Sequence, residues 1–211
     1  MINYIIGAGG HSRAVIKLLL RSFPADQLQI LNLENENNEQ NIMGVKFSKH
    51  KDLHLIREKK ETSIYCAIGD NNKRISILNY ARKLGFKTPS LISNKALLDK
   101  TSSVGNGSFV GDMAYIGPLA SVGDDCIVNT CSIVEHETII KDGTQISPNA
   151  TICGRCLIKE NCFIGAGATV IDKVIIEKFS IIGAGATVVN NITLKNCTWL
   201  GTPARKYEKN K

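Results

Sequence analysis

From residue 92 to residue 200, every sixth position of the chain holds Ile, Leu or Val, nineteen times without interruption. The series is Ile92, Leu98, Val104, Val110, Ile116, Val122, Val128, Val134, Ile140, Ile146, Ile152, Ile158, Ile164, Val170, Ile176, Ile182, Val188, Leu194 and Leu200. If these residue types fill about a quarter of positions, the odds of such a run by chance are on the order of 10⁻¹¹, so the period reflects structure. Neither the helical nor the strand period accounts for a spacing of six.

A small side chain stands four residues after nearly every aliphatic residue of the series, and Ile192, next to the end, is the one bulky exception. One large and one small inward residue in every six is the pattern of a parallel β-helix built from hexapeptides. Three hexapeptides form one triangular coil, so residues eighteen apart should stack. We therefore expect a rigid prism whose aliphatic side chains are buried between successive coils.

The first ninety residues alternate short apolar strands with helical patterns. Strands are predicted over residues 4–6, 28–33 and 64–68, and helices are predicted after the first strand and over residues 53–60 and 74–84. This alternation predicts a small parallel sheet in a Rossmann-like α/β arrangement. The predicted organisation is a Rossmann-like domain over residues 1–90 and a β-helix domain over residues 91–211.

A glycine-rich turn joins the first strand to the first helix. Gly9 and Gly10 are followed by His11 and Ser12. Glycines allow backbone N–H groups to approach a pyrophosphate, and the positive end of the following helix favours the same charge. The match to the dinucleotide fingerprint is partial because Ser12 replaces its third glycine. The turn predicts a nucleotide ligand, and His11 is expected to contact phosphate or sugar.

Two further segments follow predicted strands at the edge where open α/β sheets hold ligands. Glu34 and Asn35 follow the second strand and could bind a ribose hydroxyl or a base edge. Gly69 and Asn71 follow the third strand, although a purely structural capped turn explains these two residues equally well. All four are candidate substrate-binding residues.

His136 is the only histidine of the β-helix region and stands third in its hexapeptide, so its side chain should point outward near a corner. Glu135 and Glu137 flank it, and a carboxylate on one ring nitrogen fixes the tautomer and raises the basicity of the other. Gly154, eighteen residues further on, should leave space beside the imidazole. The cluster predicts a general base, with a solvated surface histidine and a plain turn glycine as alternatives.

Charge and hydropathy narrow the possible partners. The formal net charge is +7, but the basic residues are scattered and form no basic stripe interspersed with aromatic residues, so nucleic acid is not expected. Phosphorylated small molecules are the better-supported anions. No apolar run approaches the roughly 18 residues of a membrane span, and no signal peptide is evident, so we expect a cytoplasmic protein.

Seven cysteines raise the question of redox or metal chemistry, since Cys153 and Cys156 have the spacing of a redox pair. However, Cys126, Cys156 and Cys162 occupy the small inward position of the repeat, which predicts buried, reduced thiols. No metal is expected. A γ-type carbonic anhydrase shares the prism but needs three histidine ligands, and this β-helix has one.

The repeat and its closing segment resemble the acetyl-CoA-dependent hexapeptide acyltransferases, at residues 129–130, 135–137, 165–168, 183–186 and 201–205. Together with residues 7–11 and 67–74, the chain resembles the branch that contains UDP-4-amino-sugar N-acetyltransferases of the bacillosamine pathway and sialic acid O-acetyltransferase-like proteins. The resemblance implies a left-handed parallel β-helix and a homotrimer with active sites between neighbouring prisms. It also implies a nucleotide-sugar on the N-terminal domain and acetyl-CoA along the β-helix.

The same resemblance assigns roles to individual residues. It implies that His136 is the catalytic base and that Glu137 raises its basicity. The residues implied to bind the nucleotide-sugar are Gly9, Gly10, His11, Gly69 and Asn71, and those implied to contact acetyl-CoA are Gly154, Ala166 and Ala184. Ser12 stands where relatives often have glycine, which narrows the space beside the phosphates, and it is a further candidate substrate-binding residue. Asn129 and Gln145 are further candidates for acetyl-CoA binding. Gln145 replaces a second histidine of related proteins, so it can form a hydrogen bond with acetyl-CoA but cannot share a proton.

The expected activity is N-acetylation of a nucleotide-linked 4-amino sugar for surface glycan or glycoprotein biosynthesis. An amine on an activated sugar suits a nucleotide-binding domain, whereas free sialic acid carries no nucleotide. UDP is the expected nucleotide, although Glu34 and Asn35 replace paired aspartates of close relatives. O-acetylation of sialic acid or another sugar, and a non-catalytic nucleotide-sugar-binding scaffold, stay open as alternatives.

Overall fold

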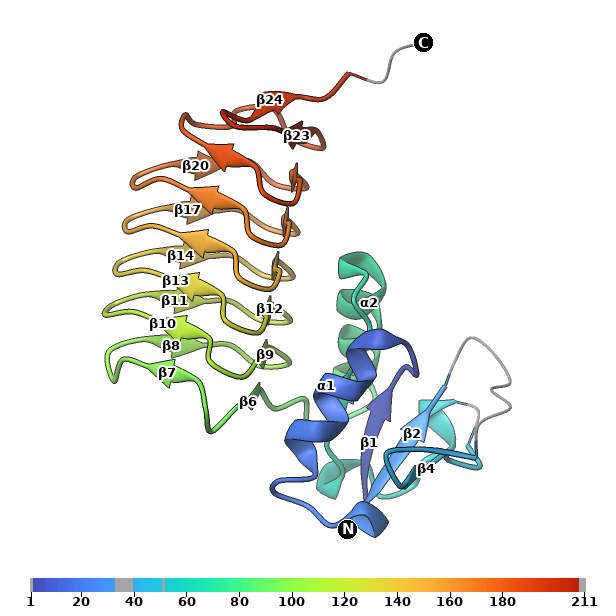
Figure 1. Cartoon of the computed structure of the whole chain (residues 1–211). Helices are drawn as coiled ribbons and strands as arrows, with labels where there is room; N and C mark the ends of the chain where they lie inside the picture. The colour runs from blue at the N-terminus through green and yellow to red at the C-terminus, as the bar shows by residue number, and fades with distance from the viewer. Residues whose placement is uncertain (1, 33–39, 51, 209–211) are drawn as a thin grey trace. The chain divides into compact units, whose positions relative to one another are not determined.

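The computed structural model describes residues 2–32, 40–50 and 52–208. The chain divides into two compact units, Met1–Leu91 and Ile92–Lys211 (Figure 1). Each unit has its own hydrophobic core. Among the described residues, no helix is both long enough and apolar enough to cross a membrane.

The N-terminal unit is built on a three-stranded parallel sheet in the order β2-β1-β5. Its strands are β1 (Asn3–Ile6), β2 (Leu28–Leu31) and β5 (Ile64–Cys66), and its α-helices are α1 (Gly10–Leu19) and α2 (Asn71–Lys83). A small antiparallel pair, β3 (Asn41–Ile42) and β4 (Val45–Lys46), and a 3₁₀ turn at Ala25–Gln27 also lie before β5. The predicted α/β class and parallel sheet are confirmed.

The helix expected over residues 53–60 is wrong. Only two 3₁₀ turns form there, Leu53–Leu55 and Lys59–Glu61, separated by the extended residue Ile56. Leu53 and Ile56 are buried, but the five residues after Ile56 are all charged. They offer no apolar stripe that a continuous helix could bury. Strands β2 and β5 also end two residues earlier than predicted.

The C-terminal unit is a left-handed parallel β-helix whose three faces are three parallel sheets. Nearly all of its strands are two residues long: β6 (Leu91–Ile92), β7 (Leu97–Leu98), β8 (Ser103–Val104), β9 (Phe109–Val110), β10 (Tyr115–Ile116), β11 (Ser121–Val122), β12 (Ile127–Val128), β13 (Ile133–Val134), β14 (Ile139–Ile140), β15 (Gln145–Ile146), β16 (Thr151–Ile152), β17 (Leu157–Ile158), β18 (Phe163–Ile164), β19 (Thr169–Val170), β20 (Ile175–Ile176), β21 (Ile181–Ile182) and β22 (Thr187–Val188). A hairpin of β23 (Thr198–Leu200) and β24 (Arg205–Lys206) ends the unit.

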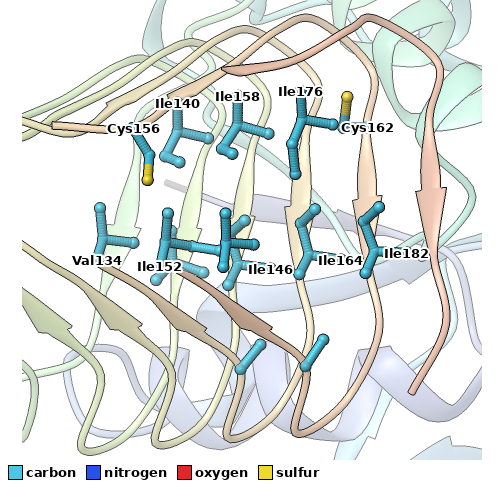
Figure 2. Packing of buried hydrophobic residues seen from close by; sticks show 14 of the residues in the cluster. Val134, Ile140, Ile146, Ile152, Cys156, Ile158, Cys162, Ile164, Ile176 and Ile182 are labelled. Atoms are coloured by element: carbon cyan, nitrogen blue, oxygen red, sulfur yellow. The ribbon is translucent and has the colours of Figure 1, made fainter. Parts of the chain in front are cut away.

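Stacking follows the predicted offset of eighteen residues. Val134 pairs with Ile152, and Ile152 pairs with Val170. These aliphatic side chains lie inside the coils and form one continuous core (Figure 2). The three cysteines predicted to be inward are buried in it, and burial raises the pKa of Cys156 to about 11 and that of Cys162 to about 12. The thiols of Cys156 and Cys162 are therefore protonated packing groups at neutral pH.

The last coil departs from the repeat. Ile192 pairs with Ile176 at an offset of sixteen residues, and Trp199 pairs with Ile182 at an offset of seventeen. The shortened coil moves Ile192 into the buried aliphatic position, while Leu194 and Leu200 are 49% and 40% exposed. The last two members of the predicted inward series are therefore wrong. The shift also explains why the small inward position is occupied by isoleucine at residue 192. The first member of the series, Ile92, is also wrong: it is 40% exposed because β6 is the end strand of its sheet and no preceding coil covers it.

Candidate active site

The corner between β13 and β14 carries the candidate catalytic group. β13 ends at Val134, and the chain turns through Glu135, His136 and Glu137 before β14 begins at Ile139. The His136 side chain points out of the coil and is 43% exposed. The turn itself is an ordinary element of the repeat, because a positive φ such as the 59° of Glu137 recurs at corner after corner.

One of the two flanking carboxylates binds the imidazole. Nδ1 of His136 lies 3.1 Å from Oε2 of Glu137, whereas Oε2 of Glu135 accepts a 3.3 Å hydrogen bond from the backbone N–H of His136. A neutral imidazole that donates Nδ1–H to Glu137 carries its lone pair on Nε2. The arrangement therefore presents a ring nitrogen that can accept a proton.

Gly154 lies directly beside the ring, one coil further along. A Cβ atom at residue 154 would lie 2.5 Å from both Cε1 and Nε2 of His136, so only glycine leaves the imidazole in this position. The backbone reinforces the stacking, since the carbonyl of His136 accepts a 2.9 Å hydrogen bond from the N–H of Arg155. His136, Glu137 and Gly154 thus form one cluster.

The other residues expected to bind acetyl-CoA lie elsewhere on the β-helix. Asn129, Ala166 and Ala184 are in the corners that follow β12, β18 and β21, across the six-stranded sheet from His136. Ala166 and Ala184 are exposed and lie on adjacent coils. Gln145 belongs to β15, and its buried Oε1 has no hydrogen-bond partner within the described part of the chain. One protomer does not bring these residues together with His136.

The glycine turn of the N-terminal unit lies between β1 and α1. Gly7 has φ +105°, and a Cβ there would lie 2.9 Å from Cγ1 of Ile68, so this glycine is required for packing. Gly9 and Gly10 are exposed, and a Cβ on either would meet nothing within 4 Å. The open side of the turn is therefore the side on which a ligand could approach the backbone.

Ser12 and His11 occupy the first turn of α1. Ser12 is fully buried, and its hydroxyl donates a 2.6 Å hydrogen bond to the carbonyl of Gly9, so it holds the turn. Burial and the nearby positive charge of Arg74 lower the pKa of His11 to about 4. His11 is therefore neutral at physiological pH.

The turn after β5 places Gly69 and Asn71 at the same edge of the sheet as the glycine turn, because β1 and β5 are parallel neighbours. Gly69 is exposed, and Asn71 begins α2, which is capped by Asp70 through a 2.8 Å hydrogen bond from the N–H of Lys73. Glu34 and Asn35 lie outside the described residues. No group of three or more potential metal ligands occurs in residues 2–32, 40–50 and 52–208.

Arg74 closes the 67–74 motif that contributes to the family resemblance, but no role of its own was predicted for it. It is 1% exposed and contacts the turn that contains Gly69 and Asn71. The available signal was its position, since Arg74, Leu78 and Ala81 share the buried face of α2. A charged residue within an apolar stripe requires hydrogen-bond partners that the sequence alone does not identify.

Comparison with known proteins decides the family. Residues 4–81 match the family described as PglD N-terminal domain, and residues 137–172 and 155–190 match bacterial transferase hexapeptide repeats. The acetyltransferase domain of PglB from Neisseria gonorrhoeae is 30% identical, with a TM-score of 0.89, over 97% of this chain and 98% of that one. The chain belongs to the hexapeptide-repeat sugar acetyltransferases.

Other solved structures extend the comparison. PerB from Caulobacter crescentus, in complex with CoA and GDP-perosamine, is 28% identical, with a TM-score of 0.87, over 99% of this chain and 98% of that one. WeeI from Acinetobacter baumannii, at 22% identity and a TM-score of 0.84 over 98% of this chain and 100% of that one, shares the fold. No curated protein was found to match the chain.

Proposed function

We propose that this acetyltransferase transfers the acetyl group of acetyl-CoA to the amine of a nucleotide-linked 4-amino sugar. The relatives support the class of both substrates, because PerB was solved with CoA and GDP-perosamine and the PglB domain was solved with acetyl coenzyme A. UDP is the nucleotide expected from the sequence. The PerB complex makes GDP the natural comparison in any assay.

The observation that carries the proposal is the cluster of His136, Glu137 and Gly154. His136 is paired through Nδ1 with Glu137, and its Nε2 faces the bare backbone of Gly154. This combination holds a base with a fixed tautomer against a residue that has no side chain to displace the ring. A solvated surface histidine would need neither the carboxylate nor the glycine.

In the proposed reaction, Nε2 of His136 removes a proton from the acceptor amine as the nitrogen attacks the thioester carbonyl. A carbon–nitrogen bond forms, the carbon–sulfur bond breaks, and the proton held by the imidazole passes to the CoA sulfur. Glu137 stabilises the imidazolium between these steps. The N–H of Gly154 donates no hydrogen bond within the described chain and is our candidate donor to the oxyanion.

We further propose that the enzyme acts as a homotrimer. Asn129, Ala166 and Ala184 lie across a sheet from His136 in one chain, so a single β-helix cannot surround both the acetyl group and the rest of CoA with these residues. A threefold arrangement would bring the corner that carries Ala166 on one protomer beside the corner that carries His136 on the next. Such a site is incomplete without a second copy.

The test is an acetyl-transfer assay on the purified protein with acetyl-CoA and a panel of UDP- and GDP-linked 4-amino sugars, with free sialic acid included. Thiol release measures turnover, and mass spectrometry identifies the acetylated product. His136→Ala should lower turnover by about 10² or more while the oligomer measured by light scattering is unchanged. Near-normal turnover of this variant would refute the catalytic assignment, and acetylation of sialic acid alone would replace the proposed acceptor.

A further inference from the structure

Arg74 is one of the largest fully buried side chains of the chain, with 1% of its surface exposed. Arginine is almost never buried to this extent unless it is paired, because an ionised group removed from water loses its hydration. Its place on α2, beside Leu78 and Ala81, would suit an aliphatic residue. The arginine therefore needs an explanation beyond packing.

The hydrogen bonds of Arg74 converge on the turn that leads into its own helix. Nη1 donates to the carbonyls of Ile68 at 3.3 Å and Gly69 at 3.0 Å. Nη2 donates to Oδ1 of Asn71 at 2.7 Å. The guanidinium thus binds three acceptor groups between the end of β5 and the first residue of α2.

These bonds determine which side of the turn carries hydrogen-bond acceptors and which side carries donors. Arginine has only donors, so Asn71 must present its oxygen to Arg74, and its NH₂ group is directed to the other side. In a trans peptide the carbonyl and the following N–H point in opposite directions. The Gly69 and Asp70 N–H groups are therefore turned away from the guanidinium, and within the described chain neither donates a hydrogen bond. The outer side of the turn presents donors.

The charge of Arg74 also reaches the glycine turn after β1. Together with burial, it keeps the pKa of His11 far below its ordinary value. His11 follows Gly9 and Gly10, whose open backbone faces outward. One buried positive charge therefore lies behind both loops at this edge of the sheet.

We propose that Arg74 is a positioning residue for the nucleotide-sugar, orienting residues 68–71 so that their donors face the diphosphate. This role rests on the proposed function, since that function supplies a diphosphate at this edge. The guanidinium itself stays buried and acts through Asn71 and the turn backbone. Its charge favours an anion at the surface above it.

The decisive variant is Asn71→Asp. Aspartate has the same shape and accepts the hydrogen bond of Arg74 at least as well, so the turn should fold as before. It has no NH₂ donor and adds a negative charge, so nucleotide binding should be lost if the donor polarity matters. Arg74→Met removes both the donors and the charge. Arg74→Lys keeps the charge but lacks the planar set of guanidinium donors.

The matched control is Arg82→Met. Arg82 lies on the same helix and also binds an asparagine three residues earlier, through a 2.8 Å bond from Nη2 to Oδ1 of Asn79. It lies in the last turn of α2, at the opposite end from Asn71. A general loss of helix stability would affect Arg82→Met as much as Arg74→Met.

The experiment measures binding of UDP, GDP and acetyl-CoA to the full-length protein by titration calorimetry. We expect Asn71→Asp and Arg74→Met to weaken nucleotide binding at least about tenfold, Arg74→Lys to recover part of the loss, and acetyl-CoA binding to stay within about twofold. Arg82→Met should bind both ligands like the wild type. If Arg74→Met does not fold, Asn71→Asp decides the question.

Two outcomes separate this role from the proposed function. If the wild type binds UDP or GDP, and Asn71→Asp and every folded Arg74 variant bind it equally well, Arg74 has no positioning role, while the proposed function stands. If the wild type acetylates nucleotide-free sugars and binds neither UDP nor GDP, the proposed acceptor class is wrong and the role of Arg74 is overturned with it.

Discussion

His136 and Gly154 are eighteen residues apart in the sequence and in contact in space, because one coil of the β-helix takes eighteen residues. The space that a Cβ at residue 154 would need is already occupied by the imidazole, whose Cε1 and Nε2 lie 2.5 Å from that point. The position of the proposed base therefore depends on the absence of a side chain on the next coil.

Gly154→Ala should impair catalysis without unfolding the protein. The methyl group would push the ring off its present position, and a displacement of about 1 Å can lower turnover about 10²-fold. Initial rates and thermal unfolding would separate the two effects. The control is Gly107→Asp, at a partly exposed corner with φ +72°, because Asp125 adopts φ 57° one coil further on. Equal rates for Gly154→Ala and the wild type would show that catalysis does not depend on the present position of the His136 ring.

Glu137→Gln should lower kcat about tenfold and leave both KM values nearly unchanged, because the amide keeps the contact with Nδ1 but loses the charge that stabilises the imidazolium. Glu135→Gln is the matched control, since Glu135 contacts the backbone N–H of His136 instead of the ring. Steady-state rates at saturating substrates give the comparison. Identical losses in the two variants would argue against a specific role for Glu137.

The β-helix was predictable because each hexapeptide repeats the same pattern of one large and one small inward residue. Val134 and Ile152 could be assigned to the core, and Gly154 to the neighbourhood of His136, from residue spacing alone. The last coil could not be predicted in this way. Its register depends on which aliphatic residue reaches the core, and Ile192 reaches it although Leu194 keeps the period.

The N-terminal unit was harder to predict because its contacts are not periodic. The glycine turn was evident from Gly7, Gly9 and Gly10, but the sequence could not distinguish the packing glycine, Gly7, from the open ones. It also gave no reason for Arg74 to be buried. The reason is visible only in the folded structure, where the Arg74 side chain reaches back from α2 and its donors meet acceptors of the Ile68–Asn71 turn.

The pH dependence of stability should carry the signature of His11. Its pKa is about 4 in the folded protein, against an ordinary value of 6.5, so the folded state resists protonation. Above pH 6.5 the residue is neutral in both states and contributes no pH dependence. Between pH 6.5 and about 4 the unfolded chain binds a proton that the folded chain does not, and the free energy of unfolding should fall by roughly 3 kcal/mol.

Urea unfolding between pH 4 and 8, followed by a probe in the N-terminal unit, measures this dependence. His11→Gln should remove the part of this pH dependence that lies between pH 6.5 and about 4. His54→Gln serves as the control, because the His54 ring is 56% exposed and pairs with Asp52 at 2.9 Å. A slope that is the same in His11→Gln and in the wild type would contradict the assignment.

The shifted register of the last coil predicts opposite sensitivities for two residues that are nearly adjacent. Ile192 is 2% exposed and packs in the core, so Ile192→Ala should lower the free energy of unfolding of the β-helix by about 2–4 kcal/mol. Leu194 continues the six-residue period but is 49% exposed, so Leu194→Ala should cost less than about 1 kcal/mol. Urea unfolding of the two variants makes the comparison. A larger loss for Leu194→Ala would mean that the regular repeat extends through the last coil and that the sixteen-residue offset is wrong.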